Sequence, residues 1–422
     1  MSPIATIARV FYRLERVGPP LPGGPVLLVA NHPNALLDPA VVSATAGRDV
    51  RFLAKSTLFS GSIVSPLVRG IGSIPVYRRT DEGADPSRNV EAFAAVGQAL
   101  AAGEVVCIFP EGVSHSEPRL QPLKTGAARI VLAAADAGVR VLVVPIGLDY
   151  ERKATFRARA VAVYGESFGA SGEGETAGAL TERIAERMRA LVALADPRSD
   201  AEVVERIERL YAAAKGLPDD PEGRTARRRL VSEGLTRLRS EDPEWYASLR
   251  ETIRAYDERL ARFGLGDRDL DRPLDLLGAL RFTAREGAFA LVLVPLLVIG
   301  ILLLWVPYRA TGIAARLRRP SLDVVSTVKA LAGLVFYVVW TLAIAGVAGW
   351  RWGPVAGVGI AAGLPLLAFT TLWAIERESA VLETARAWLA ARRAPHPERA
   401  RLTRERTALG EILDRVREWL ER

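Results

Sequence analysis

The sequence has few of the residues that form covalent cross-links or bind transition metals. Its 422 residues include one cysteine, Cys107, and three histidines. A single cysteine excludes a disulfide within the chain and is compatible with a reducing compartment. Histidine, cysteine and carboxylate residues do not cluster at the spacing of metal ligands, so we expect no metal site. Because histidine is scarce, the surroundings of each one are informative.

Acidic residues are fewer than basic ones, 48 against 56, which gives the chain a formal net charge of +8. Such a balance suits nucleic acid, anionic lipid or phosphorylated substrates. Most basic residues alternate with acidic ones in helical patterns, and the excess lies beside long apolar runs. This distribution favours anionic lipid, and we expect no nucleic-acid partner.

The first 17 residues contain no apolar block of signal-peptide length. Apolar residues recur there at helical spacing from Ile4 to Leu14, with arginines between them, which predicts a short basic amphipathic helix. Two interpretations of this helix stay open. It either lies on a membrane surface or packs on the domain that follows it.

Residues 24–165 alternate short apolar runs with helical patterns, which predicts an α/β domain with a largely parallel sheet. The runs are rich in valine and isoleucine and are bounded by glycine, proline or asparagine, as buried strands are. The predicted strands are Val26–Ala30, Val50–Leu53, Ile71–Tyr77, Val105–Phe109, Val141–Ile146 and Ala160–Tyr164.

The rest of the chain predicts helices of two kinds. From residue 174 apolar residues recur every three or four positions among arginine and glutamate, which predicts a module of helical hairpins. Three uncharged segments follow, each near or above the roughly 20 residues that cross a bilayer as a helix. They are residues 288–306, 330–350 and 353–375.

These patterns predict four parts of the chain. They are the α/β domain with its N-terminal helix at 1–173, the helical module at 174–275, a hydrophobic membrane region at 276–376 and a charged helical tail at 377–422.

Basic residues flank the three apolar segments unevenly, and the link at 350–352 is nearly free of them. Because positive residues stay on the cytoplasmic side, the last two segments are expected to form a spanning hairpin. The first segment either spans as well, or bends near Pro295 and Gly300 and leaves on the face that it entered. We place the α/β domain on the cytoplasmic face of an integral membrane protein.

The stretch "LLVANHPNALLDPA", residues 27–40, places a histidine where a buried strand is predicted to end. Ligands of open α/β sheets bind at such strand ends. Asp38 is close enough to His32 to accept a hydrogen bond from one ring nitrogen, which would leave the other nitrogen able to take a proton from a substrate hydroxyl. The pair would act as a base and its orienting group, with the ligand supplying the nucleophile.

The stretch "IGSIPVYRRTD", residues 71–81, ends a predicted strand in Arg78 and Arg79. Two guanidinium groups at a strand end suit a phosphate, because each offers a bidentate fork. A solvated pair of charges is an equally good interpretation of these two residues taken alone.

The stretch "CIFPEGVSHSEPRLQPLKTGAAR", residues 107–129, turns immediately after a predicted strand. Glu111 stands at the turn and could hydrogen-bond substrate hydroxyls, and Gly112 permits a tight backbone path. Ser114 is a further candidate substrate contact. Lys124 opens a helix and could bind a phosphate.

Four blocks in this order, "NHPNALLD", "GSIPVYR", "FPEG" and "VVPIG", resemble the motifs of the lysophosphatidic-acid and glycerol-3-phosphate acyltransferase superfamily. The resemblance covers about residues 10–165. The usual motif has four residues between its histidine and aspartate, whereas five separate His32 from Asp38, and Leu37 stands at the expected aspartate position. This spacing and the long third block are similar to the fungal-type glycerol-3-phosphate/dihydroxyacetone-phosphate acyltransferases.

The resemblance implies an acyltransferase-type α/β fold, with a mixed, largely parallel sheet flanked by helices. It also implies a membrane-bound O-acyltransferase in phospholipid synthesis, in which His32, held by Asp38, deprotonates a hydroxyl that attacks acyl-CoA or acyl-carrier protein. No cofactor beyond this acyl co-substrate is implied. Glycerol-3-phosphate, dihydroxyacetone phosphate and lysophosphatidate stay open as acceptors. The residues expected to bind the acceptor are Arg78, Arg79, Glu111, Gly112, Ser114 and Lys124.

Two other classes of protein are alternatives to an enzyme. A membrane-anchored lipid-binding or scaffold protein with an inactive site would keep the fold without needing His32, and the shifted position of Asp38 is its support. A transporter would need ionisable groups inside the apolar segments, which have none.

Overall fold

The computed structural model describes residues 2–59, 64–77, 89–117, 119–171, 174–192, 198–218, 220–271 and 276–420. The chain divides into two compact units. Unit 1 consists of Met1–Ala201, Asp220–Ser232 and Arg319–Ala330, and unit 2 consists of Glu202–Asp219, Glu233–Arg318 and Leu331–Arg422. Unit 1 therefore includes a short stretch from between the first two apolar segments.

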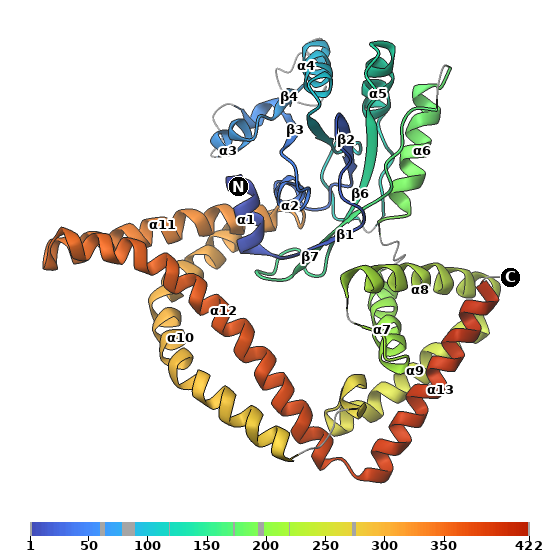
Figure 1. The fold of residues 1–422 in the computed structure, drawn as a ribbon, viewed down its shortest axis with the longest axis vertical. Coiled ribbons are helices and arrows are strands. Elements are labelled where there is room, and N and C mark those ends of the chain that lie inside the picture. Colours follow the sequence, from blue (N-terminus) through green and yellow to red (C-terminus); the bar gives the residue numbers. More distant parts are fainter. Residues whose placement is uncertain are drawn as a thin grey trace. The chain divides into compact units, whose positions relative to one another are not determined.

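Unit 1 is built on a seven-stranded sheet with the order β1-β7-β6-β2-β5-β3-β4 (Figure 1). β6 and β7 run antiparallel, and the other neighbouring strands run parallel. This mixed, largely parallel sheet confirms the predicted fold class. The strands are β1 (Arg13–Val17), β2 (Val26–Ala30), β3 (Val50–Lys55), β4 (Ile74–Val76), β5 (Val105–Ile108), β6 (Leu142–Tyr150) and β7 (Arg159–Tyr164).

β2 lies at the centre of the core, and all five of its residues are buried. Its side chains alternate between the two faces of the sheet, as the strand period requires. Leu28 belongs to the apolar cluster on one face, and Leu27 and Val29 belong to the cluster on the other. A strand covered on both faces needs a continuous apolar run, which explains why "VLLVA" carries no polar residue.

Helices cover both faces of this sheet (Figure 1). One face packs against α1 (Pro3–Phe11) and α2 (Leu37–Thr45), and the other packs against α4 (Asn89–Ala101), α5 (Gly126–Asp136) and α6 (Ala177–Arg189). α3 (Ser65–Gly70) and a 3-10 turn at Ser56–Leu58 precede β4. α6 lies within the predicted helical module, yet Leu180, Ile184 and Met188 join the apolar cluster on the sheet. Its apolar stripe thus completes the core of unit 1.

The N-terminal helix is shorter than the periodicity predicts. It ends at Phe11, because Tyr12 is extended and β1 then pairs with β7. Leu14 therefore lies in a strand, and the prediction that the helix extends to this residue is wrong. Ile4, Ala8 and Phe11 are buried in the core cluster. The apolar face of α1 thus packs on the domain that follows it, which is the second of the two interpretations given above.

Unit 2 is helical. Its helices include α9 (Pro243–Phe263), a 3-10 turn at Asp267–Asp271, α10 (Leu276–Arg318), α12 (Pro354–Arg393) and α13 (His396–Leu420). It also holds most of α7 (Arg198–Ala214) and α11 (Val325–Trp352), which begin in unit 1. α8 (Pro221–Glu241) is divided between the units, with residues 221–232 in unit 1 and residues 233–241 in unit 2. Three helical stretches within the described residues are long and apolar enough to cross a membrane: Leu293–Arg318, Val325–Trp352 and Pro354–Ile375. They indicate that the protein associates with a membrane.

α10 is one continuous helix that contains the first of the predicted apolar segments. It bends along its length (Figure 1) and holds Pro295 and Pro307 in its interior. Proline removes a backbone N–H donor and crowds the preceding turn, so bends of long helices often lie at prolines. A bend in this helix fits the re-entrant interpretation, but its path through the bilayer stays a prediction.

α10 and α12 pack closely at Gly300. A Cβ atom at this glycine would lie 1.8 Å from Oγ1 of Thr371 and 2.9 Å from its Cβ. Thr371 cannot rotate away without losing the hydrogen bond from Oγ1 to the backbone oxygen of Leu367. We therefore expect Gly300→Val to lower the free energy of unfolding of detergent-solubilised protein by about 1–3 kcal/mol. Gly346→Val is the matched control, because a Cβ there meets no atom within 4 Å, and equal losses in both variants would contradict this packing.

Candidate active site

The predicted site lies where three neighbouring strands end. β2 is hydrogen-bonded to β5 on one side and β6 on the other, and all three run parallel. Their carboxyl ends therefore meet at one edge of the sheet, which is where open α/β sheets bind ligands. Asn31 and His32 follow β2, Phe109 and Glu111 follow β5, and Tyr150 ends β6.

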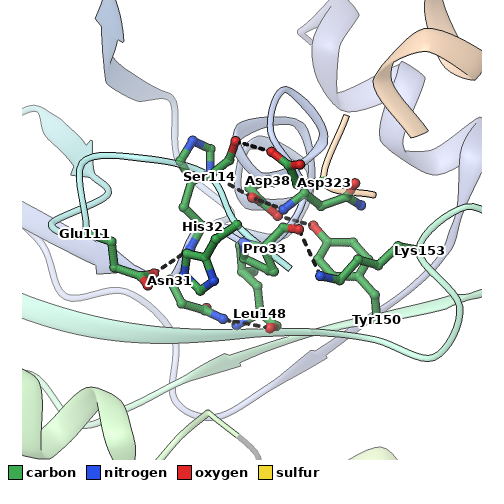
Figure 2. A network of polar contacts seen from close by, with 12 residues as sticks. Asn31, His32, Pro33, Asp38, Glu111, Ser114, Leu148, Tyr150, Lys153 and Asp323 are labelled. Carbon is green, nitrogen blue, oxygen red and sulfur yellow. Dashed lines mark hydrogen bonds and ion pairs between the residues drawn. The ribbon is translucent and has the colours of Figure 1, made fainter. Parts of the chain in front are cut away.

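Asn31 fixes the first turn of the chain after β2. Its side-chain Nδ2 donates to the backbone oxygen of Leu148 at 3.0 Å, and its Oδ1 accepts from the backbone nitrogen of Leu148 at 2.7 Å (Figure 2). The amide thus continues the pairing of β2 with β6 by one more residue. Because Asn31 is buried, these two bonds also satisfy its polar atoms.

His32 and Asp38 are in direct contact. Nδ1 of His32 lies 2.8 Å from Oδ2 of Asp38, whose side chain is fully buried in the first turn of α2 (Figure 2). The carboxylate also accepts hydrogen bonds from the backbone nitrogen of Asn34 at 2.7 Å and from the hydroxyl of Tyr150 at 2.6 Å. Three donors offset the cost of burying this charge and hold it beside the imidazole.

This contact determines which ring nitrogen of His32 can act on a ligand. An ionised carboxylate only accepts hydrogen bonds, so Nδ1 carries the proton and Nε2 of the neutral ring is an acceptor. No described residue hydrogen-bonds to Nε2. The side chain of His32 is 15% exposed, and its ring stacks on Phe109 at 4.1 Å between centroids. The ring is thus held in place with one basic nitrogen able to face a ligand.

Glu111 is buried and joins three loops. Its Oε1 accepts from the backbone nitrogen of His32 at 2.9 Å, and its Oε2 accepts from the backbone nitrogen of Gln121 at 2.9 Å. Oε2 is also bonded to Nε2 of His115, whose backbone nitrogen donates to the carbonyl of His32 at 3.1 Å. Both oxygens of Glu111 are thus engaged, and one of them holds the backbone of His32 in place. The predicted contact of Glu111 with substrate hydroxyls stays a prediction.

Replacing Glu111 with glutamine is expected to destabilise the fold. The amide nitrogen would face a backbone N–H that now donates to a carboxylate, and one buried hydrogen bond would be lost. We expect the free energy of unfolding to fall by about 1–3 kcal/mol, as measured by thermal or denaturant unfolding. The same substitution at the exposed Glu117 is the control, and a similar loss there would show that the contacts of Glu111 are not the cause.

Gly112, Ser114 and Lys124 lie along the same block. Gly112 has φ +76°, and a Cβ there would lie 2.5 Å from Nζ of Lys124. A side chain at this position would therefore be strained and would displace the ammonium group. The side chain of Lys124 is exposed, and the hydroxyl of Ser114 donates to Asp323 at 2.6 Å. Arg78 and Arg79 lie outside the described residues.

Sequence reasoning missed Tyr150 and Lys153. The fourth block lies in a strand that is predicted to end at Ile146, but β6 continues to Tyr150, and Pro145 lies inside it opposite Val29. The end of the strand that lies at the site is therefore Tyr150, four residues beyond the predicted end. The signal that could have found it is the run "GLDY", which keeps the alternation of a strand beyond the proline.

Residues 10–149 match the family model described as Acyltransferase. These residues belong to the acyltransferase family. The matched region begins in α1 and ends one residue before the end of β6, so it contains the His32–Asp38 pair and the turn of Glu111. The family that the four blocks predict is thereby confirmed.

Two relatives of this domain have names that state an acyltransferase activity. Glycerol-3-phosphate O-acyltransferase 2 of Saccharomyces cerevisiae is 33% identical over 190 residues, which cover 42% of this chain and 25% of the yeast protein. Lyso-ornithine lipid O-acyltransferase of Brucella abortus is 33% identical over 153 residues, which cover 35% of this chain and 53% of that protein. The chain thus spans a quarter to about half of the length of these relatives.

A solved structure, the 1-acyl-sn-glycerophosphate acyltransferase PlsC of Thermotoga maritima, is also similar. It has 18% sequence identity and a TM-score of 0.34, and the match covers 46% of this chain and 79% of PlsC. The yeast relative agrees with the predicted similarity to the fungal-type branch.

Proposed function

We propose that this protein is a membrane-bound O-acyltransferase of phospholipid synthesis. It would move a fatty acyl group from acyl-CoA or acyl-carrier protein to a hydroxyl of glycerol-3-phosphate or 1-acylglycerol-3-phosphate. The observation that carries the proposal is the His32–Asp38 pair at the carboxyl end of β2, inside an acyltransferase domain. The names of the relatives, which refer to glycerol-3-phosphate and to a lyso-lipid as acceptors, support an acceptor with a free hydroxyl.

In this mechanism Nε2 of His32 accepts the proton of the acceptor hydroxyl as the oxygen attacks the thioester carbon. The carboxylate of Asp38 stabilises the imidazolium that forms. The tetrahedral intermediate then expels the thiolate of the donor, which takes the proton from the imidazolium. The products are the ester and the free thiol, and His32 returns to its neutral form. Donors that stabilise the intermediate oxyanion complete such a site.

The acceptor phosphate would bind to Arg78, with Arg79 and Lys124 as further candidates. Lys124 is suited to this role because its exposed ammonium lies beside the bare Cα of Gly112. Ser114 would contribute a hydroxyl on the same block. Glu111 would hold the loop of His32 in position. The acceptor site would then combine cations from the second and third blocks.

Membrane attachment suits a reaction whose product is a lipid. The three apolar helical stretches would anchor the enzyme in the bilayer, and the basic residues that flank them would keep the catalytic domain on the cytoplasmic face. Acyl-CoA and acyl-carrier protein are water-soluble donors that could reach a site on this face.

The test is an assay of detergent-solubilised full-length protein with acyl-CoA and acyl-carrier-protein donors. Release of the free thiol is measured with glycerol-3-phosphate, dihydroxyacetone phosphate or lysophosphatidate in turn. We expect release to require an acceptor, and the fastest acceptor identifies the substrate. Folded protein that turns over none of these combinations would favour the inactive lipid-binding or scaffold protein instead. That alternative is weakened by the hydrogen bond between Asp38 and His32, since its support was the position of Asp38.

A further inference from the structure

The stretch Arg319–Ala330, which follows α10 and includes the first six residues of α11, belongs to unit 1, although its neighbours along the chain on both sides belong to unit 2. We refer to it as the linker segment. Ser326 in this segment is fully buried, and Ala330 packs against the apolar cluster that contains α1 and α2. A segment that only connected α10 to α11 would need neither a buried serine nor packing contacts with the core of another unit.

Two polar side chains of the linker segment hold the loop that follows β6. The hydroxyl of Ser326 donates to the backbone oxygen of Lys153 at 2.7 Å, and Nζ of Lys329 donates to the backbone oxygen of Ala154 at 2.5 Å. Nζ of Lys153 in turn donates to the backbone oxygen of Pro33 at 3.0 Å (Figure 2). Through Lys153 the segment therefore reaches the residue that follows His32.

The same loop is tied to the turn after His32 by a second path. The hydroxyl of Tyr12 donates to the backbone oxygen of Lys153 at 2.5 Å and accepts from the side chain of Asn34 at 2.8 Å. Burial raises the pKa of Tyr12 to about 12, so this hydroxyl stays protonated and keeps donating at neutral pH. Ser326 and Tyr12 thus donate to one carbonyl oxygen at the junction of three chain segments.

Asp323 connects the linker segment to the third block. Its Oδ2 accepts from the hydroxyl of Ser114 at 2.6 Å, as Figure 2 shows. Burial alone would raise the pKa of this carboxyl, but hydrogen bonds from Ser114 and Ser321 hold it below its usual value. The group therefore accepts as a charged carboxylate, which makes the contact with Ser114 stronger than one between neutral groups.

We propose that the linker segment is part of the active site, and that Asp323 is a positioning residue that fixes Ser114 for the acceptor. This rests on the proposed function, because Ser114 lies in the block assigned to acceptor binding. The site would then be assembled from the loops after β2, β5 and β6 together with the segment that runs from the end of α10 into the start of α11. Loss of the Asp323 carboxylate would free the third block while leaving His32 and Asp38 in contact.

The test uses the full-length protein in detergent, with acyl-CoA and glycerol-3-phosphate as probes. For Asp323→Ala we expect KM for glycerol-3-phosphate to rise about tenfold, while kcat changes less than about threefold. Asp323→Asn keeps an oxygen that accepts from Ser114 and should restore most of the affinity. Leu317→Ala, an exposed position of α10 outside the segment, should leave both constants unchanged.

Ser114→Ala and its double variant with Asp323→Ala separate a positioning role from a general loss of stability. If Asp323 acts through Ser114, the double variant should have the KM of Ser114→Ala alone. Full addition of the two effects, or an unchanged KM in Asp323→Ala, would overturn the proposal. Asp323→Glu, which moves the carboxylate by one methylene, repeats the test if the alanine variant does not fold.

A measurement without turnover keeps this proposal separate from the proposed function. Amide hydrogen exchange should accelerate over residues 112–117 in Asp323→Ala, because the hydrogen bond from the nitrogen of His115 to the carbonyl of His32 lies there. Unchanged exchange would count against the linker segment even if the enzyme were active. A wild-type protein with no acyl transfer, by contrast, would overturn the proposed function and leave the exchange result standing.

Discussion

Replacing His32 with alanine is expected to lower kcat for acyl transfer by about 10²–10⁴-fold. The imidazole is the group at the sheet edge whose Nε2 is placed to take a proton, because its other nitrogen is held by Asp38 at 2.8 Å. Alanine removes the base but leaves the backbone contacts of this residue with Glu111 and His115. The measurement is acceptor-dependent thiol release at saturating donor and acceptor, with a thermal unfolding curve for each protein.

His396→Ala is the matched control for this substitution. His396 begins α13 and is exposed, so its loss removes a histidine without touching the sheet. We expect this variant to keep wild-type kcat and stability. If His32→Ala retains more than about a tenth of wild-type kcat, the role of general base belongs to another group and the mechanism is wrong, although the family assignment stands.

Asp38→Asn is expected to lower kcat by about 10²–10³-fold, the second largest effect. The carboxylate accepts from His32, Asn34 and Tyr150, whereas an amide has one acceptor oxygen and two N–H donors. The amide would compete to donate to the imidazole, and the imidazolium formed during the reaction would lose its counter-charge. Both effects oppose proton transfer to Nε2 more than they oppose binding, so KM should change little.

Tyr150→Phe separates the charge of Asp38 from its positioning. This variant removes one of the three hydrogen bonds to the carboxylate but keeps the charge, and we expect kcat to fall by about tenfold or less. Its effect should therefore lie between wild type and Asp38→Asn. A Tyr150→Phe variant as impaired as Asp38→Asn would mean that the orientation of the carboxylate, and not its charge, supports His32.

The central strands and the His32–Asp38 pair could be predicted because their signals are local. β2 has the bounds that its apolar run predicts, and Asn31 ends it at the point where polar residues resume. His32 and Asp38 are six positions apart, and one turn followed by the start of α2 brings them together. Ala35, in the turn that joins them, has φ +42°.

Partners that lie far apart in the sequence could not be predicted in this way. Tyr150 and Asp38 are separated by 112 positions, and Ser114 and Asp323 by 209. Their contacts follow from the order of the strands and from the return of the chain at residue 319, and no local pattern encodes either. β1 was missed for a related reason, because its residues "RLERV" are polar and become a strand only by pairing with β7.

Unit 1 cannot be complete when its first 201 residues leave the ribosome, because Arg319–Ala330 is made only after α10. During synthesis the nascent sheet can form, since β1 to β7 all precede this point. The carbonyl of Lys153 and the hydroxyl of Ser114 gain their partners Ser326 and Asp323 only after α10 has been synthesised. Under the proposed membrane attachment, completion of unit 1 would be coupled to insertion of the chain into the bilayer, and full activity would be delayed until that step.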